Sequence, residues 1–98
     1  MTLEVRIRPE AELDLADATL WYEERRSELG RQFLDEAAST FSLIAETPHL
    51  YPIVHRNTRR ALMHRFPFGI YYQVEATAVV ILAVMHGSRH PHRWKRRG

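Results

Sequence analysis

The sequence predicts a small α+β domain in which a helical hairpin packs on an antiparallel meander sheet, in the order β-α-α-β-β-β. Two observations lead to this prediction. Residues 9–46 carry apolar side chains at helical spacing, interrupted once at Leu29-Gly30. Residues 59–86 contain three extended runs joined by short connections, which is typical of a meander. A chain of 98 residues has room for one domain, which we expect to span residues 1–98.

The first strand and the first helix lie at the N-terminus. Leu3, Val5 and Ile7 alternate with charged residues, which indicates a short strand with one polar face. Pro9 suits the first turn of a helix, because its missing N–H is not needed there. We expect Trp21 and Tyr22 to end this helix inside the core. Its buried stripe is predicted at Ala11, Leu15, Ala18 and Tyr22.

A second helix is predicted from about Arg31 to Glu46. Its apolar seam consists of Phe33, Ala37, Phe41 and Ile44, flanked by Leu34. Because the break between the helices is short, they should form an antiparallel hairpin. We expect a core in which Phe33, Phe41 and Ile44 of this helix meet Leu82 and Val84 of the sheet.

Three strands are predicted at about 59–66, 69–75 and 78–86. The last is apolar on both faces, so we place it in the interior of the sheet. The hairpin should cover one sheet face. We expect the other face to be open, or covered by a segment of another protein.

Charge divides the chain into two halves. Residues 1–54 contain five Arg and eleven Asp or Glu, whereas residues 55–98 contain nine Lys or Arg and one acid, Glu75. Such asymmetry favours an anionic partner. The chain has no cysteine, which excludes disulfides and thiolate metal sites and is compatible with the cytoplasm.

Other function classes lack their sequence signals. The N-terminus has no long apolar segment, so we expect no signal peptide. The longest apolar run, residues 76–85, is far shorter than the roughly 20 residues that cross a membrane, so we expect no membrane association. The six histidines form no compact ligand motif, and we expect neither a metal nor a cofactor.

The basic residues are candidates for binding an anion. If the strand arginines and those after the last strand meet at one sheet edge, they form a cationic groove for nucleic acid or for an acidic protein segment. The alternative is a solvated surface with a loose tail. We expect residues 89–97 to serve binding rather than folding, because Pro91 prevents a continuous strand or helix there. The set comprises Arg56, Arg59, Arg60, Arg65, Arg89, Arg93, Lys95, Arg96 and Arg97.

Histidines and aromatic residues lie among these cations. Metal-free RNA cleavage needs a base, an acid and a cation, which a histidine between arginines could supply. The alternative for each of His64, His86, His90 and His92 is a structural hydrogen bond. Exposed rings could stack on bases, whereas packing explains most of them more simply. Trp94 is the least core-like ring, although it could also cap the hairpin or the sheet. The rings are Phe66, Phe68, Tyr71, Tyr72 and Trp94.

An ordered series of segments resembles the RelE/ParE toxins of bacterial type II toxin–antitoxin systems. The series is WYEE, LGRQFLDE, the IAETP segment, RRALMHRFPFGIYYQVE and ILAVMHGSRHPHRW, from about Val5 to Trp94. The resemblance implies a compact toxin that is neutralised by a cognate antitoxin, usually encoded beside it, in a toxin–antitoxin hetero-oligomer.

The family has two branches with different targets. RelE-like members cleave mRNA on the ribosome without a metal, and ParE-like members inhibit DNA gyrase. RelE-like sequences usually read RLVYQV where this chain reads GIYYQV, so Gly69 replaces a phosphate-binding arginine. Arg89 does match the arginine after the last strand, but the final catalytic residue has no secure counterpart, His92 and Trp94 being only nearby. The ParE branch is therefore favoured, and we expect a gyrase inhibitor and growth-arresting, plasmid-stabilising toxin rather than an enzyme.

The resemblance leaves two sets of candidate residues. If the protein is a nuclease, the catalytic candidates are Arg65, His86 and Arg89. The candidates for contact with the target or the partner are Arg59, Arg60, Arg65, Arg89, Arg93 and Trp94.

Overall fold

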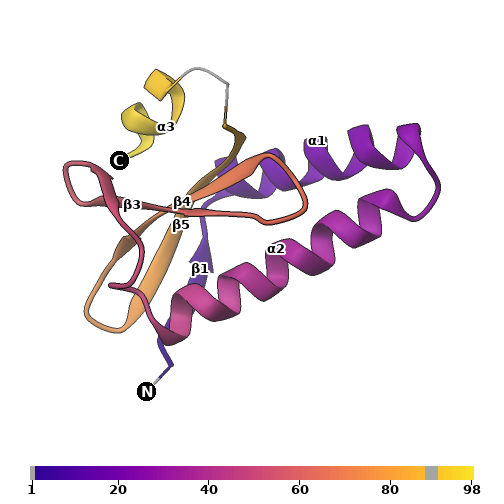
Figure 1. Ribbon diagram of the computed structural model, residues 1–98. Helices are drawn as coiled ribbons and strands as arrows, with labels where there is room; N and C mark the ends of the chain where they lie inside the picture. The colour runs from indigo at the N-terminus through magenta and orange to yellow at the C-terminus, as the bar shows by residue number, and fades with distance from the viewer. Residues whose placement is uncertain (1, 88–90) are drawn as a thin grey trace.

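The computed structural model describes residues 2–87 and 91–98, which form a helical hairpin, a sheet and a short terminal helix (Figure 1). The predicted fold class is confirmed, and two elements are added to it, a short strand before the meander and the terminal helix. In chain order the elements are β1 (Glu4–Ile7), α1 (Pro9–Arg25), α2 (Leu29–Glu46), β2 (Ile53–His55), β3 (Thr58–Leu62), β4 (Phe68–Val74), β5 (Ala78–His86) and α3 (Pro91–Arg97).

The break between α1 and α2 falls at residues 26–28, so the expectation of a break at Leu29-Gly30 is wrong. Glu28 turns the chain with a φ of 73°. The Glu23 carboxylate accepts hydrogen bonds from the backbone N–H groups of Glu28 and Gly30, each at 3.0 Å. Gly30 lies inside α2 where the two helices touch, and a Cβ atom there would lie 2.6 Å from the Thr19 carbonyl oxygen. Glycine therefore serves close helix packing here rather than chain reversal.

Within the described residues the sheet has five strands in the order β1-β5-β4-β3-β2. β2 to β5 form the antiparallel meander, whereas β1 pairs with β5 in parallel. The interior position of β5 is confirmed, and all its residues but the last are buried. The sheet is therefore mixed. Parallel pairing of β1 with β5 is possible because a long connection, the helical hairpin and the meander, separates the two strands in the chain.

β3 ends at Leu62, four residues before the predicted boundary. The backbone turns at Met63, whose N–H donates to the Phe68 carbonyl oxygen at 2.9 Å. The Glu36 carboxylate of α2 accepts hydrogen bonds from the backbone N–H groups of His64 and Arg65. The connection before β4 is therefore anchored to the hairpin instead of continuing the sheet.

The main core lies between the hairpin and one sheet face. Phe33 and Ile44 of α2 are fully buried there with Tyr72 and Val84, as predicted for three of the five named core residues. Phe41 is only partly buried at the margin of this core. Leu82 is buried but lies outside it, which corrects the prediction. The register places Tyr71 opposite Ala83 and Tyr72 opposite Ile81, so Leu82 is the extra residue of a β-bulge.

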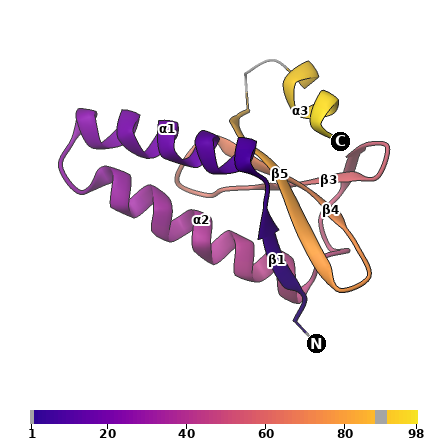
Figure 2. The same ribbon diagram turned by 180° about the vertical axis from the view of Figure 1, so that it is seen from behind.

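The second face of the sheet is partly covered by α3, so the expectation that this face is open or covered by another protein is wrong. The alternative of a loose tail is excluded for the described residues 91–98 as well. Trp94 is 5% exposed and stacks on Tyr71 with ring centroids 4.4 Å apart. Ala83, Met85 and Val54 complete this smaller core. Pro91 begins the helix instead of preventing it, because the first turn does not need its N–H. Figure 2 shows α3 as a separate coil across the sheet from the hairpin.

No helix in the described part of the chain is long and apolar enough to cross a bilayer.

The hydroxyl of Tyr72 gives a pH-dependent prediction. It donates a hydrogen bond to the Pro48 carbonyl oxygen at 2.7 Å, and burial raises the pKa of Tyr72 to about 12. The folded protein therefore keeps a proton that the unfolded chain loses above about pH 10. This contribution, on the order of 2 kcal/mol, should be present below pH 10 and decrease as the pH rises towards 12.

Urea unfolding of the wild type and Tyr72→Phe tests this prediction. At pH 8 the variant should lose about 1 kcal/mol, the value of one hydrogen bond. Above pH 10 the free energy of unfolding should fall less steeply in the variant than in the wild type. Parallel curves would show that Tyr72 does not titrate as inferred.

Candidate functional site

A surface groove of about 690 Å³ lies between α1 and the ends of β4 and β5. Its walls mix apolar rings with charged groups, as is common where proteins bind partners or ligands. Its lining includes Asp14, Asp17, Trp21, Tyr22, Phe68, Val84, Met85, His86 and Arg93.

Trp21 forms the exposed aromatic rim of this groove. It is 50% exposed, so the prediction that it belongs to the core is wrong. The guanidinium carbon of Arg25 lies 3.8 Å from the Trp21 ring centroid. Leu13 and Leu20 of the same helix are also exposed. Asp17 lies between these leucines at helical spacing, so this side of α1 presents apolar and acidic side chains together.

Two rings of the groove lining, Tyr22 and Phe68, belong to a cluster of aromatic rings that continues into the core. Tyr22 stacks on Phe33 with centroids 5.3 Å apart and meets Phe66 edge-on at 4.8 Å. Burial raises the pKa of Tyr22 above its ordinary value. Phe68 links this cluster to His86, whose ring centroid lies 5.6 Å away. The cluster is rigidly packed, and the groups at the rim are the ones available to a partner.

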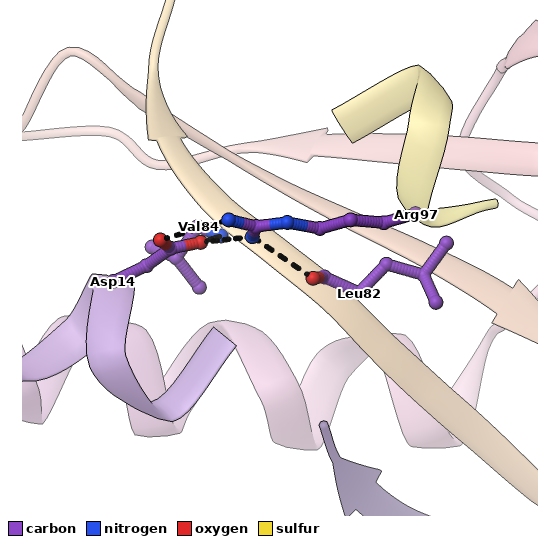
Figure 3. Close-up of polar contacts among 4 residues, drawn as sticks. All are labelled: Asp14, Leu82, Val84 and Arg97. Carbon is purple, nitrogen blue, oxygen red and sulfur yellow. Dashed lines mark hydrogen bonds and ion pairs between the residues drawn. The ribbon is translucent and has the colours of Figure 1, made fainter. Parts of the chain in front are cut away.

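Asp14 joins α1, β5 and α3 at one end of the groove (Figure 3). Its carboxylate accepts a hydrogen bond from the Val84 backbone N–H at 3.0 Å and pairs with the Arg97 guanidinium at 2.6 Å. The same guanidinium donates to the Leu82 carbonyl oxygen at 3.2 Å. Both side chains are mostly buried, with 17% and 22% of their surfaces exposed.

The two strand arginines, Arg59 and Arg60, have different roles. Arg59 donates hydrogen bonds to the carbonyl oxygens of Tyr51 and His49, at 2.7 and 3.3 Å, and so fixes the loop after α2. The Arg60 guanidinium forms no hydrogen bond or ion pair with any described residue, and its Nε is buried without a partner. Only Arg60 of this pair is therefore available to an anion.

Gly69 accommodates the stem of Arg60. A Cβ atom at position 69 would lie 3.2 Å from the Arg60 Cδ and 3.3 Å from the Tyr71 ring. Both distances are shorter than ordinary van der Waals contact. A larger residue at position 69 would require the Arg60 stem and the Tyr71 ring to shift by a few tenths of an ångström.

Arg65 belongs to the hairpin side of the molecule. Its guanidinium donates to the Gln32 Oε1 of α2 at 2.7 Å. The groove is lined by His86 and Arg93 but not by Arg65. The structure therefore does not gather Arg65 and His86 in one groove, as a shared catalytic site would require.

The candidate contact residues near the C-terminus differ in their exposure. Arg93 is exposed at the groove. Trp94 is buried in the second core, so it is unavailable for stacking on a base or a target. His92 is exposed on α3 and, like His86, already has an interaction partner. Arg89 and His90 lie outside the described residues.

The described residues contain no group of three or more His, Cys, Asp or Glu that could hold a metal ion. The described residues that line the groove include no serine, threonine, cysteine or lysine that could act as a nucleophile. Its composition instead suits association with another macromolecule through an aromatic anchor and a charged rim.

Two residues of this site escaped sequence reasoning. In the sequence, Asp14 is one of several acids near the start of a helix, where acids are common. Its partner Arg97 is 83 positions away, so the sequence gives no local sign of the contact. Trp21 reads as a core residue because it stands beside Tyr22. Trp21 follows Leu13 by eight residues and Leu20 by one. This spacing indicates that the three residues share a side of α1.

Comparison with known proteins gives one family and two similar folds. The family model for the ParE toxin of the type II toxin–antitoxin system parDE matches residues 5–91. A chain of the chromosomal ParDE toxin–antitoxin system from P. aeruginosa superposes with a TM-score of 0.78 at 15% identity, covering 87% of this chain and 96% of that one. A chain of the toxin–antitoxin complex RelBE2 from Mycobacterium tuberculosis superposes with a TM-score of 0.60 at 21% identity, covering 88% and 92%. No curated protein matches the sequence.

Replacing Asp14 should destabilise the protein far more than replacing Asp17, a groove residue on the same helix. Asp14→Ala leaves the Val84 N–H and the Arg97 guanidinium without their partner, at a cost of roughly 2–3 kcal/mol. Asp17→Ala makes the same chemical change at an exposed position and should cost less than about 0.5 kcal/mol. Urea unfolding of both variants measures the difference. Equal effects would mean that the Asp14 contacts contribute no more than an exposed carboxylate does.

Proposed function

Because this chain belongs to the ParE toxin family of type II toxin–antitoxin systems, we propose that it inhibits DNA gyrase and is neutralised by a cognate antitoxin. In this proposal the free toxin acts in the bacterial cytoplasm and arrests growth. The antitoxin binds it in a hetero-oligomer and prevents contact with gyrase.

The packing around Gly69 is the observation that favours gyrase over mRNA. A RelE-like toxin places a phosphate-binding arginine at this position, whereas here the space beside Gly69 is filled by the stem of Arg60. Losing a charge-assisted contact to a transition state costs roughly 2.7–4 kcal/mol, or a hundredfold or more in rate. The position of Arg65 on the hairpin side supports the same choice, because it removes a second cation from the groove.

The exposed cations of α3 are suited to the target contact. Arg93, Lys95 and Arg96 are exposed, whereas Arg97 is paired with Asp14. Gyrase bound to DNA offers phosphates and acidic side chains, which exposed arginines attract over about one Debye length. Arg93 is the strongest single candidate because it also lines the groove.

One observation favours cleavage of mRNA as the second candidate function. His86 and Arg93 line the same groove, so a histidine and a cation stand near each other. Such a pair could transfer a proton and bind a phosphate during metal-free cleavage.

A comparison of two exposed arginines tests the target. The protein should inhibit gyrase supercoiling, and Arg93→Ala should raise the inhibitory concentration about fivefold, since an exposed charge contact contributes about 1 kcal/mol. Arg31→Ala is the matched control, because the Arg31 side chain is 77% exposed at the far end of the hairpin. Normal supercoiling together with rapid, codon-phased mRNA cuts after induction would establish the second candidate instead.

The antitoxin should bind the rim formed by Trp21. An exposed tryptophan flanked by Leu13 and Leu20 is a suitable anchor for an amphipathic helix. With the protein encoded beside this gene as the probe, Trp21→Ala should weaken the complex by about 2 kcal/mol, or roughly thirtyfold.

Leu34→Ala is the control for Trp21→Ala, because Leu34 is exposed on α2 but does not line the groove. Calorimetry should show less than a threefold change for this control. Equal affinities of the two variants would place the antitoxin elsewhere.

A further inference from the structure

The outer side of α3 carries cations that no described residue neutralises. Trp94 and Arg97 lie three positions apart, on one side of the helix. They face the body of the protein, where they contact Tyr71 and Asp14. The other cations of the helix are exposed to solvent, and none of them forms a salt bridge within the described part of the chain. They are Arg93, Lys95 and Arg96.

The turn between β2 and β3 places a further cation beside α3. His55 pairs with Thr58, so Arg56 lies in this turn, and it is exposed. The His55 ring centroid lies 6.0 Å from that of Trp94. A Cβ atom at Gly98 would lie 2.6 Å from the Thr58 Oγ1. The turn and the terminal helix are neighbours in both views (Figures 1 and 2). Together they form a cationic surface, the α3 surface, which consists of Arg56, Arg93, Lys95 and Arg96.

The backbone at Arg56 indicates that its side chain serves a purpose other than folding. Arg56 has a φ of 51°, in the left-handed region that favours glycine. An arginine in this conformation costs backbone strain. Its guanidinium makes no hydrogen bond or ion pair with any residue that the structure describes, so no contact within the protein offsets that strain. Strained residues of this kind are common at binding sites.

The composition of the α3 surface suits a phosphate backbone better than an acidic protein. Protein interfaces are built around an apolar core, whereas interfaces with DNA are more polar and more positively charged. The described side chains of α3 include one large apolar group, Trp94, and it is buried. The surface therefore offers charge without an apolar anchor.

The same surface lacks what single-stranded RNA requires. Proteins bind single strands by stacking the bases on exposed aromatic rings. The large aromatic rings beside α3, Tyr71 and Trp94, are buried against each other. Duplex DNA keeps its bases stacked inside and presents phosphates outside, so it needs only the exposed cations.

We propose that the α3 surface binds the phosphate backbone of duplex DNA. Each exposed cation neutralises a phosphate, and no base is read. The inference rests on the proposed inhibition of gyrase and specifies its contact: the toxin holds the DNA that gyrase carries as well as gyrase itself. Arg93 is the link between the two contacts, because it also lines the groove beside α1.

Fluorescence anisotropy of a short labelled duplex tests the inference in the absence of gyrase. The wild type should bind in dilute salt with a Kd between about 1 and 100 µM. If all four cations neutralise phosphates, the logarithm of the association constant should fall with the logarithm of the salt concentration with a slope of about −3.6. Two duplexes of unrelated sequence should bind equally, because phosphate contacts carry no sequence information. The absence of binding, or a slope weaker than about −1, would overturn the inference.

Single substitutions locate the contact. Arg56→Ala and Arg96→Ala should each weaken binding at least threefold and reduce the steepness of the slope by about 1. Arg96→Lys should bind within about twofold of the wild type, because lysine also binds phosphate as a point charge.

Arg31→Ala is the matched control for these variants. It removes the same charge from a side chain that is 77% exposed on the hairpin, and it should keep the wild-type slope. Circular dichroism should show that all variants fold. Equal effects of Arg31→Ala and Arg96→Ala would mean that only the net charge matters, and would overturn the assignment of the α3 surface.

Two other ligands complete the test. Single-stranded RNA of the same length and a glutamate peptide should each bind at least about threefold more weakly than the duplex, which has the highest density of charge. Tighter binding of either ligand would overturn the inference and assign the surface to RNA or to an acidic protein. Inhibition of supercoiling without duplex binding would overturn this inference and leave the proposed function intact. Duplex binding without inhibition would contradict the proposed function, while the DNA-binding surface would stand.

Discussion

The Asp14 carboxylate is the contact on which the arrangement of the elements depends. β1 ends at Ile7, and the Arg8 N–H donates to the Ile81 carbonyl oxygen at 3.0 Å just before Pro9 starts α1. Beyond this point β5 loses its parallel neighbour, and buried backbone groups without partners would be costly. Asp14 accepts the Val84 N–H, and Arg97 donates to the Leu82 oxygen, so two side chains continue the pairing where the strand stops. This contact also joins α1 to α3 at one end of the groove.

The basic half of the chain serves both folding and binding. Arg59, Arg65 and Arg97 are engaged by carbonyl oxygens, Gln32 and Asp14, so they hold elements together. Arg60 and Arg93 remain available, and they line separate grooves. The predicted single cationic groove is therefore replaced by two separate cationic positions, one beside the β3 edge and one at the groove of α1. Such a division is compatible with the two partners that the proposed function requires.

The elements that could be predicted from the sequence are those with local patterns. Residues 78–86 are apolar on both faces, and their boundaries match β5. The hairpin follows from apolar spacing in residues 9–46. The terminal helix could not be predicted in this way, because seven residues rich in cations with a leading proline have no apolar period. Its position depends on Trp94 meeting Tyr71 and on Arg97 meeting Asp14, and both contacts join residues distant in sequence. The site was predicted in part: His86 and Arg93 line the groove, whereas Asp14 and Trp21 required the three-dimensional arrangement.

A double-mutant cycle between Asp14 and Arg97 tests most directly whether this contact couples the terminal helix to the body of the protein. The free energy of unfolding would be measured for the wild type, both alanine variants and the double variant. Because the two side chains share a hydrogen-bonded and mostly buried contact, we expect a coupling energy of about 1–2 kcal/mol. Additivity within about 0.3 kcal/mol would contradict the account, since it would mean that α3 and α1 are held in place independently of each other.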